Sequence, residues 1–197
     1  ASIAVASVSD APVADHGVAF TMNEDGTLTI TEAQLLGTSS DADNDALHVE
    51  GLHLTTGGGA LTVDLVGGVP LVPPSWTFTP AQDFSGAVPL MYNVTDGTTT
   101  PVSVTASIAV ASVNDAPVAD HGVAFTMNED GTLTITEAQL LGTSSDADND
   151  ALHVEGLHLT TGGGALTLVT GGAAGAPPSW TFTPAQDFSG AVPLMYN

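Results

Sequence analysis

The chain has 197 residues, of which 43% are hydrophobic and 11% are charged, a composition typical of a globular protein with about one or two domains. Every charged side chain is acidic and the formal net charge is −22, so the basic contacts to phosphate on which nucleic-acid binding depends are excluded. The absence of Cys excludes disulfide scaffolds and cysteine zinc sites, and no apolar stretch approaches the ~20 residues of a membrane helix.

The sequence is a tandem repeat. Residues 1–62 recur as residues 106–167 at an offset of 105, with a single difference. Residues 73–93 recur as residues 177–197 at an offset of 104, and the short stretch in between, where the copies differ, predicts a surface loop. A period of this length is too long for a solenoid unit and matches the ~100 residues of an immunoglobulin-like sandwich.

Within one copy, short runs of alternating apolar and polar residues predict half-buried strands. These runs lie at residues 27–31, 47–49, 76–79 and 102–113. Turns that contain glycine separate them and predict hairpins between most of the strands. Thr31 and Gln34 form a capping-box pattern, which predicts one helical turn. The expected fold class is therefore all-β, with tandem immunoglobulin-like β-sandwiches of about 105 residues each.

The two ends of the sequence complement each other. Residues 1–8 are identical to residues 106–113, so the chain opens with a copy of the last strand of a repeat. The second repeat stops at Asn197, before its own copy of that strand. We expect an orphan strand, a complete repeat and a repeat without its last strand, over residues 1–9, 10–113 and 114–197. An open sandwich of this kind leaves a groove and unpaired backbone groups.

Acidic residues gather in the turns rather than along the strands. In the first copy they lie at Asp10, at Glu24-Asp25 and within residues 41–45, and the second copy repeats them. Clustered carboxylates with no basic residue to neutralise them favour Ca²⁺ over the plainer interpretation of solvated acidic turns. An EF-hand is excluded, because counting from Asp41 puts Ala46 and Leu52 where that loop needs Gly and Glu.

The order of these motifs resembles that of cadherin repeats, with a last strand, an acidic linker that ends in proline, a glutamate after the first strand and a D-x-D loop. The sequence resembles the bacterial cadherin-like repeats of giant extracellular adhesins more closely than it resembles cadherin repeats. Those repeats carry an N-D-A-P linker, an E-D-G-T-L turn, a D-x-D loop and an F-T-P-A-x-x-F-x-G segment. The matching positions are residues 114–117, 129–133, 146–148 and 182–190. The resemblance covers essentially the whole chain and implies tandem cadherin-like sandwiches.

The resemblance also implies a calcium site at the junction of the two repeats. In cadherins the interdomain ions are held by linker Asn and Asp, by the glutamate of the preceding domain and by the D-x-D of the following domain. Carried over residue by residue, this implies about two or more Ca²⁺ ions at a complete junction. The ligands so implied are Glu24, Asn114, Asp115, Asp146 and Asp148.

Two half sites follow from the same resemblance. Asp10, Asp41 and Asp43 are assigned to the junction before the first repeat, and Glu129 to the junction after the second. The linker departs from the cadherin pattern, because Ser112 replaces its first Asp and its second Asn is deleted.

Other candidate sites are weaker. His48 and Glu50 share the polar face of an alternating strand that also carries His53, a pair that could bind zinc, although a plain solvent face is the favoured interpretation. No nucleophile motif accompanies the Ser, His and Asp residues, so no active site is expected. Trp76 and Trp180 are expected to be buried rather than to form a ligand platform.

The expected function is that of a non-catalytic, calcium-stabilised structural or adhesive repeat, located outside the cell or on its surface. Neighbouring copies or repeats of the same protein are the expected partners, and the sequence identifies no receptor. A self-polymerising subunit, joined by donation of residues 1–8 to the incomplete second repeat of a neighbour, is the alternative. A module that binds glycan or protein is disfavoured, because a binding tip would differ from its neighbour whereas these copies are nearly identical.

Overall fold

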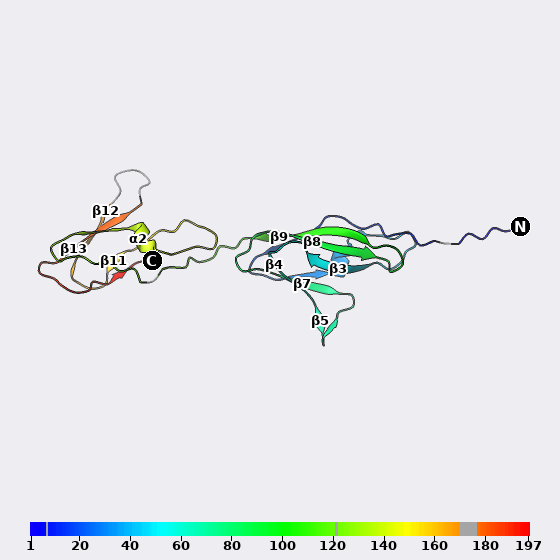
Figure 1. Cartoon of the computed structure of the whole chain (residues 1–197), viewed down its shortest axis with the longest axis horizontal. Helices are drawn as coiled ribbons and strands as arrows, with labels where there is room; N and C mark the ends of the chain where they lie inside the picture. The colour runs from blue at the N-terminus through cyan, green and yellow to red at the C-terminus, as the bar shows by residue number, and fades with distance from the viewer. Residues whose placement is uncertain (7, 121, 170–176) are drawn as a thin grey trace. The chain divides into compact units, whose positions relative to one another are not determined.

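The chain folds into two β-rich units, Ala1–Asn114 and Asp115–Asn197 (Figure 1). The computed structural model describes residues 1–6, 8–120, 122–169 and 177–197. Within these residues no helix has the length and apolar character needed to cross a membrane.

The first sheet of unit 1 has four strands in the order β1-β9-β8-β3. These strands are β1 (Val18–Asn23), β9 (Val102–Ala111), β8 (Gly86–Thr95) and β3 (His48–Leu54). Strand β1 runs parallel to β9, and the other pairs are antiparallel. Ile108 of β9 lies opposite Phe20 of β1 and Val88 of β8. The last strand of the repeat is thus an internal strand with a partner on each side.

The second sheet of unit 1 has the order β2-β7-β4. Its strands are β2 (Leu28–Thr31), β7 (Ser75–Pro80) and β4 (Gly59–Val63). Ile30 and Phe78 of this sheet are fully buried in the same core as Val88 and Ile108 of the first sheet, because alternate residues of each strand face the partner sheet. The predicted all-β fold is confirmed.

A single helical turn precedes β3 in unit 1, as the sequence predicts. Helix α1 (Glu32–Leu36) begins at Thr31, whose side chain and that of Gln34 form the expected capping box. Its counterpart α2 (Glu137–Leu141) has the same cap. The hydroxyl of Tyr92 donates to the carbonyl of Leu35 at 2.8 Å and ties β8 to this turn.

The prediction that hairpins join most strands is wrong. The turn at Asp25-Gly26 leads from β1 into β2, and residues 57–59 lead from β3 into β4, so both connections pass from one sheet to the other. A turn motif predicts only that the chain changes direction. Which sheet the next strand joins depends on its pairing with strands distant in sequence.

The stretch predicted as a loop carries a small hairpin, β5 (Leu65–Val66) and β6 (Val69–Pro70), which extends away from the rest of unit 1 (Figure 1). Most of its copy, residues 170–176, falls outside the described residues.

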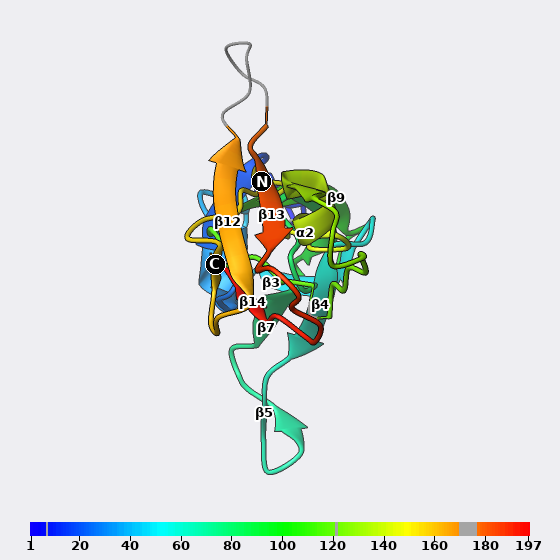
Figure 2. The same ribbon diagram turned by 90° about the vertical axis from the view of Figure 1, so that its left-hand side faces the viewer.

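Unit 2 keeps one sheet intact and has a reduced second sheet. Its strands β10 (Leu133–Thr136), β13 (Ser179–Pro184) and β12 (Gly164–Val169) pair as their counterparts do in unit 1, and β12 and β13 lie side by side in Figure 2. The other pair consists only of β11 (His158–Leu159) and β14 (Leu194–Met195). Residues 123–128 copy the sequence of β1 but form no strand.

The turn between β8 and β9 is organised by one carboxylate. Asp96 accepts hydrogen bonds from the backbone N–H groups of Thr98 and Thr99, at 2.7 and 2.8 Å, and from the Thr99 hydroxyl at 2.7 Å. These donors favour the charged form and lower the pKa of Asp96 from 3.8 to about 2.

This lowered pKa predicts an acid-sensitive contribution to the stability of unit 1. Because the folded-state pKa lies below the ordinary value, the contribution is fully present above pH 3.8 and is lost as the pH falls through about 2. Asp96→Asn removes the titrating group. We expect urea unfolding between pH 5 and pH 2 to show a steeper loss of stability in the parent chain than in Asp96→Asn. Equal pH dependence in the two proteins would contradict this role.

Candidate metal-binding linker

The D-x-D loop of unit 1 is folded around the carboxylate of Asp41. Its Oδ1 accepts from the backbone N–H groups of Asp43 and Asp45, at 2.8 and 3.2 Å. Asn44 between them has a φ of 61°, a left-handed conformation that Asn tolerates better than most residues. The short Asp-x-Asp spacing thus forms a compact turn around the Asp41 carboxylate.

The linker residue Asp10 is brought to this loop by backbone pairing. Val13 and Ser40 form an isolated antiparallel bridge with hydrogen bonds of 2.8 and 2.9 Å. The backbone N–H of Asp10 donates to Oδ2 of Asp43 at 2.8 Å. The structure therefore brings together all three residues that the sequence assigns to the first half site: Asp10, Asp41 and Asp43.

Unit 2 repeats this arrangement. The backbone N–H of Asp115 donates to Oδ2 of Asp148 at 2.7 Å, and the N–H of Asp148 donates to Oδ1 of Asp146 at 2.9 Å. The bridge that positions the linker is conserved in the copy, between Val118 and Ser145. Three of the five predicted junction ligands are therefore neighbours within unit 2.

The other two predicted junction ligands belong to unit 1. Glu24 directly follows β1 and is only 7% exposed. Its backbone N–H donates to the carbonyl of Ala111 at 3.1 Å, and its Oε1 accepts from the backbone N–H of Val113 at 2.8 Å. These contacts hold Glu24 beside the start of the linker that contains Asn114, which is exposed.

Glu129 has the same local sequence as Glu24 but a different environment. Glu129 is exposed, whereas Glu24 is buried against residues that follow β9. No segment within residues 115–197 copies β9 or the residues that follow it. The burial of this glutamate therefore depends on a strand distant in sequence rather than on its own turn.

The oxygen donors of this loop suit a hard cation in part. Asp41 Oδ2 is buried and has no hydrogen-bond partner among the residues that the structure describes, and such an oxygen costs free energy unless a proton or a cation satisfies it. Carboxylate oxygens clustered in this way are the ligands that Ca²⁺ prefers. Within the described residues, no three His, Asp or Glu side chains are grouped so that they could hold a metal ion by themselves. The residues fit Ca²⁺ only if further oxygen donors, such as linker amide or backbone carbonyl groups, complete its coordination shell.

The two histidines considered for zinc, His48 and His53, contact groups of the fold itself, and the two tryptophans lie in the cores. His48 Nδ1 lies 3.5 Å from Oε1 of the buried Glu32, and His53 Nδ1 lies 2.7 Å from the carbonyl of Gly51. Trp76 and Trp180 are buried, as predicted. The zinc alternative gains no support from this geometry, because the His48 ring contacts a carboxylate of the helical turn.

Two features of this region were not predicted from the sequence. One is the bridge that carries the linker to the D-x-D loop, which has no local sequence signal because its strands are single residues. The other is Glu32, whose Oε1 accepts from the backbone N–H of Val49 at 2.9 Å. A glutamate in the first turn of a helix is ordinarily an exposed residue, so its burial follows from tertiary packing alone.

Comparison with known families gives the same assignment for both repeats. The family model described as a cadherin-like domain matches residues 8–111 and again residues 113–197. The resemblance found in the sequence is thereby confirmed for both repeats. A search of curated proteins found no match.

Several solved structures are similar at low sequence identity. The endo-fucoidan hydrolase MfFcnA4 of glycoside hydrolase family 107 is 17% identical with a TM-score of 0.38, and the match covers 94% of this chain and 26% of that one. The human desmocollin-1 ectodomain is 10% identical with a TM-score of 0.36, over 97% of this chain and 36% of that one. Domains 4–9 of the surface layer protein SbsC are 13% identical with a TM-score of 0.27, over 96% and 29%. The chain therefore spans only about a quarter to a third of these proteins, and similarity at this level does not bear on function.

Proposed function

Because the chain belongs to the cadherin-like domain family, we propose that it is a non-catalytic, extracellular structural repeat whose linkers are stabilised by calcium ions. Cadherin-like domains are typically non-catalytic and extracellular, and they generally bind calcium. The observation that carries the proposal for this chain is the acidic linker arrangement, which occurs twice. In the first copy it includes a buried oxygen of Asp41 that has no hydrogen-bond partner within the described part of the chain.

The residues of the chain determine the effect that calcium would have on the linker. The five ligands proposed for the complete junction are Glu24, Asn114, Asp115, Asp146 and Asp148, four of which are carboxylates. Asp10, Asp41 and Asp43 belong to the junction before unit 1, and Glu129 to a junction after unit 2. Without a cation these crowded carboxylates repel one another, and no Lys or Arg is present to neutralise them. Calcium supplies the positive charge and links oxygens of adjacent repeats, which stiffens the linker.

Calcium removal provides the first test. A ligand that binds only the folded state, at about one hundred times its Kd, stabilises that state by about 2.7 kcal/mol. We expect titration calorimetry to detect calcium binding at micromolar to millimolar concentrations and EDTA to lower the melting temperature by several degrees. Absence of binding heat together with an unchanged melting curve in EDTA would refute the calcium proposal.

A matched pair of glutamate variants locates the site. Glu24→Gln keeps an oxygen that can accept from Val113 N–H but removes a charge from the junction, so calcium affinity should fall roughly tenfold or more. Glu129→Gln makes the same change in the same local sequence, at a residue assigned to no junction within the chain. The affinity of the second variant should equal that of the parent, at protein concentrations where the chain sediments as a monomer. Equal affinities of all three proteins would exclude Glu24 as a ligand.

A further inference from the structure

Strand β4 is an open edge of the second sheet of unit 1. Within the described residues it pairs with one strand, β7, which lies between β2 and β4. The N–H of Asp64 donates to the carbonyl of Ser75 at 2.9 Å, and in an antiparallel ladder such residues alternate with residues whose backbone groups point to the other side. The N–H and C=O groups of Gly59, Leu61 and Val63 therefore point away from β7, towards the open side of the edge.

The other edge strands of unit 1 carry features that discourage pairing with another chain, such as a short length, nearby charges or a bulge. Strand β2 has 4 residues, β3 has a bulge between Glu50 and His53, and β1 is followed directly by Glu24 and Asp25. Strand β4, described over its whole length, has no charged residue, no proline and no bulge. Among the four edge strands, all within the described residues 18–111, it is also the one with an exposed large apolar side chain, Val63 at 42%.

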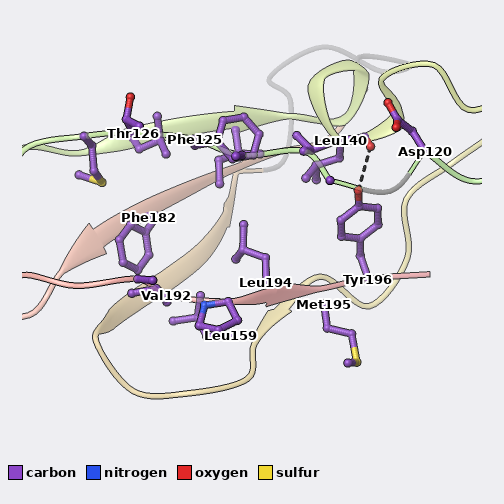
Figure 3. Close-up of a pocket in the computed structure, with 18 of the residues that line it drawn as sticks. Asp120, Phe125, Thr126, Leu140, Leu159, Phe182, Val192, Leu194, Met195 and Tyr196 are labelled. Carbon is purple, nitrogen blue, oxygen red and sulfur yellow. Dashed lines mark hydrogen bonds between the residues drawn. The ribbon is translucent and has the colours of Figure 1, made fainter.

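Side chains of β4 alternate between the core and the solvent. Phe182 of β13, the copy of Phe78, points into a cavity inside unit 2 in Figure 3. In unit 1 Phe78 is fully buried and lies opposite Leu61, which packs against the same core. The neighbours of Leu61, Ala60 and Thr62, are exposed and occupy the solvent face of the sheet. A strand added beside β4 would therefore need apolar residues on one face and small or polar residues on the other.

We propose that the β4 edge of a second copy of the chain pairs with this edge, antiparallel and related by a two-fold axis, with Leu61 opposite Leu61. In this register Val63 lies opposite Gly59, so the exposed apolar side chain of the edge meets the residue that has no side chain. Ala60 lies opposite Thr62 on the solvent face. Main-chain hydrogen bonds join the two sheets, and the contact is isologous, so it closes at two copies.

The distribution of charge favours a second copy as the partner. The chain has a net charge of −22, whereas β4 is uncharged. The next residue, Asp64, accepts from the hydroxyls of Ser75 and Thr77 on β7, at 2.5 and 2.8 Å, so its carboxylate is held away from the open side. In the proposed register Asp64 lies opposite Gly58, which puts the two Asp64 residues of a pair roughly 20 Å apart along the ladder, about twice the Debye length at 0.1 M salt.

Repulsion between the remaining carboxylates of the two copies opposes this pairing. Salt screens that repulsion, since the Debye length falls from about 30 Å at 0.01 M to about 3 Å at 1 M. Association should therefore strengthen as salt is added, whereas association through ion pairs weakens. One pair of strands is a small interface, so we expect a dissociation constant in the micromolar to millimolar range. The pairing needs no calcium and goes beyond the proposed function.

The first test compares the same substitution at two exposed valines of the intact chain. All chains carry Leu168→Glu, which closes the edge of β12, because residues 164–167 repeat residues 59–62. In EDTA, sedimentation equilibrium should show this chain dimerising, with a dissociation constant that falls roughly tenfold or more between about 0.01 and 1 M NaCl. At the higher salt concentration, adding Val63→Glu should weaken dimerisation roughly tenfold or more, because a carboxylate then enters the pairing.

Adding Val69→Glu instead is the matched control. Val69 lies in β6 and is 64% exposed, so this chain gains the same charge and loses the same apolar side chain outside the edge. It should dimerise as the Leu168→Glu chain does. A Leu168→Glu chain that stays monomeric in 1 M NaCl, or equal dimerisation of the chains with Val63→Glu and Val69→Glu, would overturn the proposal.

The second test reads the register and adds no charge to the edge. The chain has no Cys, so introduced thiols can react only with each other. In the proposed register Ala60 and Thr62 of different copies form a non-hydrogen-bonded pair, in which side chains approach most closely. Ala60→Cys and Thr62→Cys chains, both with Leu168→Glu, are mixed in equal amounts and oxidised in 1 M NaCl. The mixed disulfide dimer should form roughly tenfold or more faster than the dimer of either chain alone, and equal rates would exclude this pairing.

Discussion

Replacing Ile108 by alanine lowers the free energy of unfolding of unit 1 by about 2–5 kcal/mol, whereas replacing Ile3 by alanine leaves it unchanged. The two isoleucines lie in identical octapeptides, so local sequence preferences are matched. Ile108 is fully buried in β9, opposite Phe20 and Val88, whereas Ile3 is 91% exposed. The difference measures the cost of removing three buried carbons and leaving a cavity between two strands.

The measurement uses the one tryptophan in each unit. In a Trp180→Phe background, the fluorescence of the buried Trp76 reports the urea unfolding of unit 1 alone. Concentrations are kept low enough for the chain to be a monomer, so that association does not contribute to stability. If Ile3→Ala destabilised unit 1 as much as Ile108→Ala, residues 1–8 would be packed in the monomer and the interpretation of an exposed segment would be wrong.

The features predicted correctly from the sequence are local. The capping box needs only Thr31 and Gln34, and the compact D-x-D turn needs only the spacing of short acidic side chains. The repeat period alone predicts the sandwich class, because one domain of this size buries two sheets against each other. Each of these predictions depends only on residues close together in the sequence or on the length of one repeat.

The features that were missed depend on contacts distant in sequence. The parallel pairing of β1 with β9 joins segments on opposite ends of the repeat, and no local pattern specifies it. Glu24 and Glu129 make the same point for the candidate site, since one is buried and the other exposed although their neighbouring residues are identical. A sequence motif identifies a ligand type, whereas burial and coordination depend on which strand completes the sheet.

Three consecutive glycines, Gly57, Gly58 and Gly59, follow β3 in unit 1. Among them, Gly59 is the position where an added methyl group is expected to lower the stability of the unit most. A Cβ at Gly59 would overlap the backbone carbonyl of Thr79 on the paired strand and lie 2.8 Å from the Phe78 ring. Neither group can move independently, because Phe78 is fully buried and Thr79 is held in the ladder between β4 and β7. The close approach of two strands, rather than a turn, requires glycine here.

Gly59→Ala should therefore lower the free energy of unfolding of unit 1 by about 1–3 kcal/mol or more, as overpacking of a dense core does. Gly57→Ala is the matched control, because a Cβ there has no atom within 4 Å. It should leave stability unchanged or raise it by up to about 1 kcal/mol, since alanine reduces the conformational entropy of the unfolded chain. Gly164→Ala repeats the experiment in unit 2, where the added Cβ meets Thr183 and Phe182, and Trp180 fluorescence then reports the loss. Equal stabilities of Gly59→Ala and Gly57→Ala would mean that β4 and β7 separate enough to admit a methyl group, and that their close approach does not require glycine.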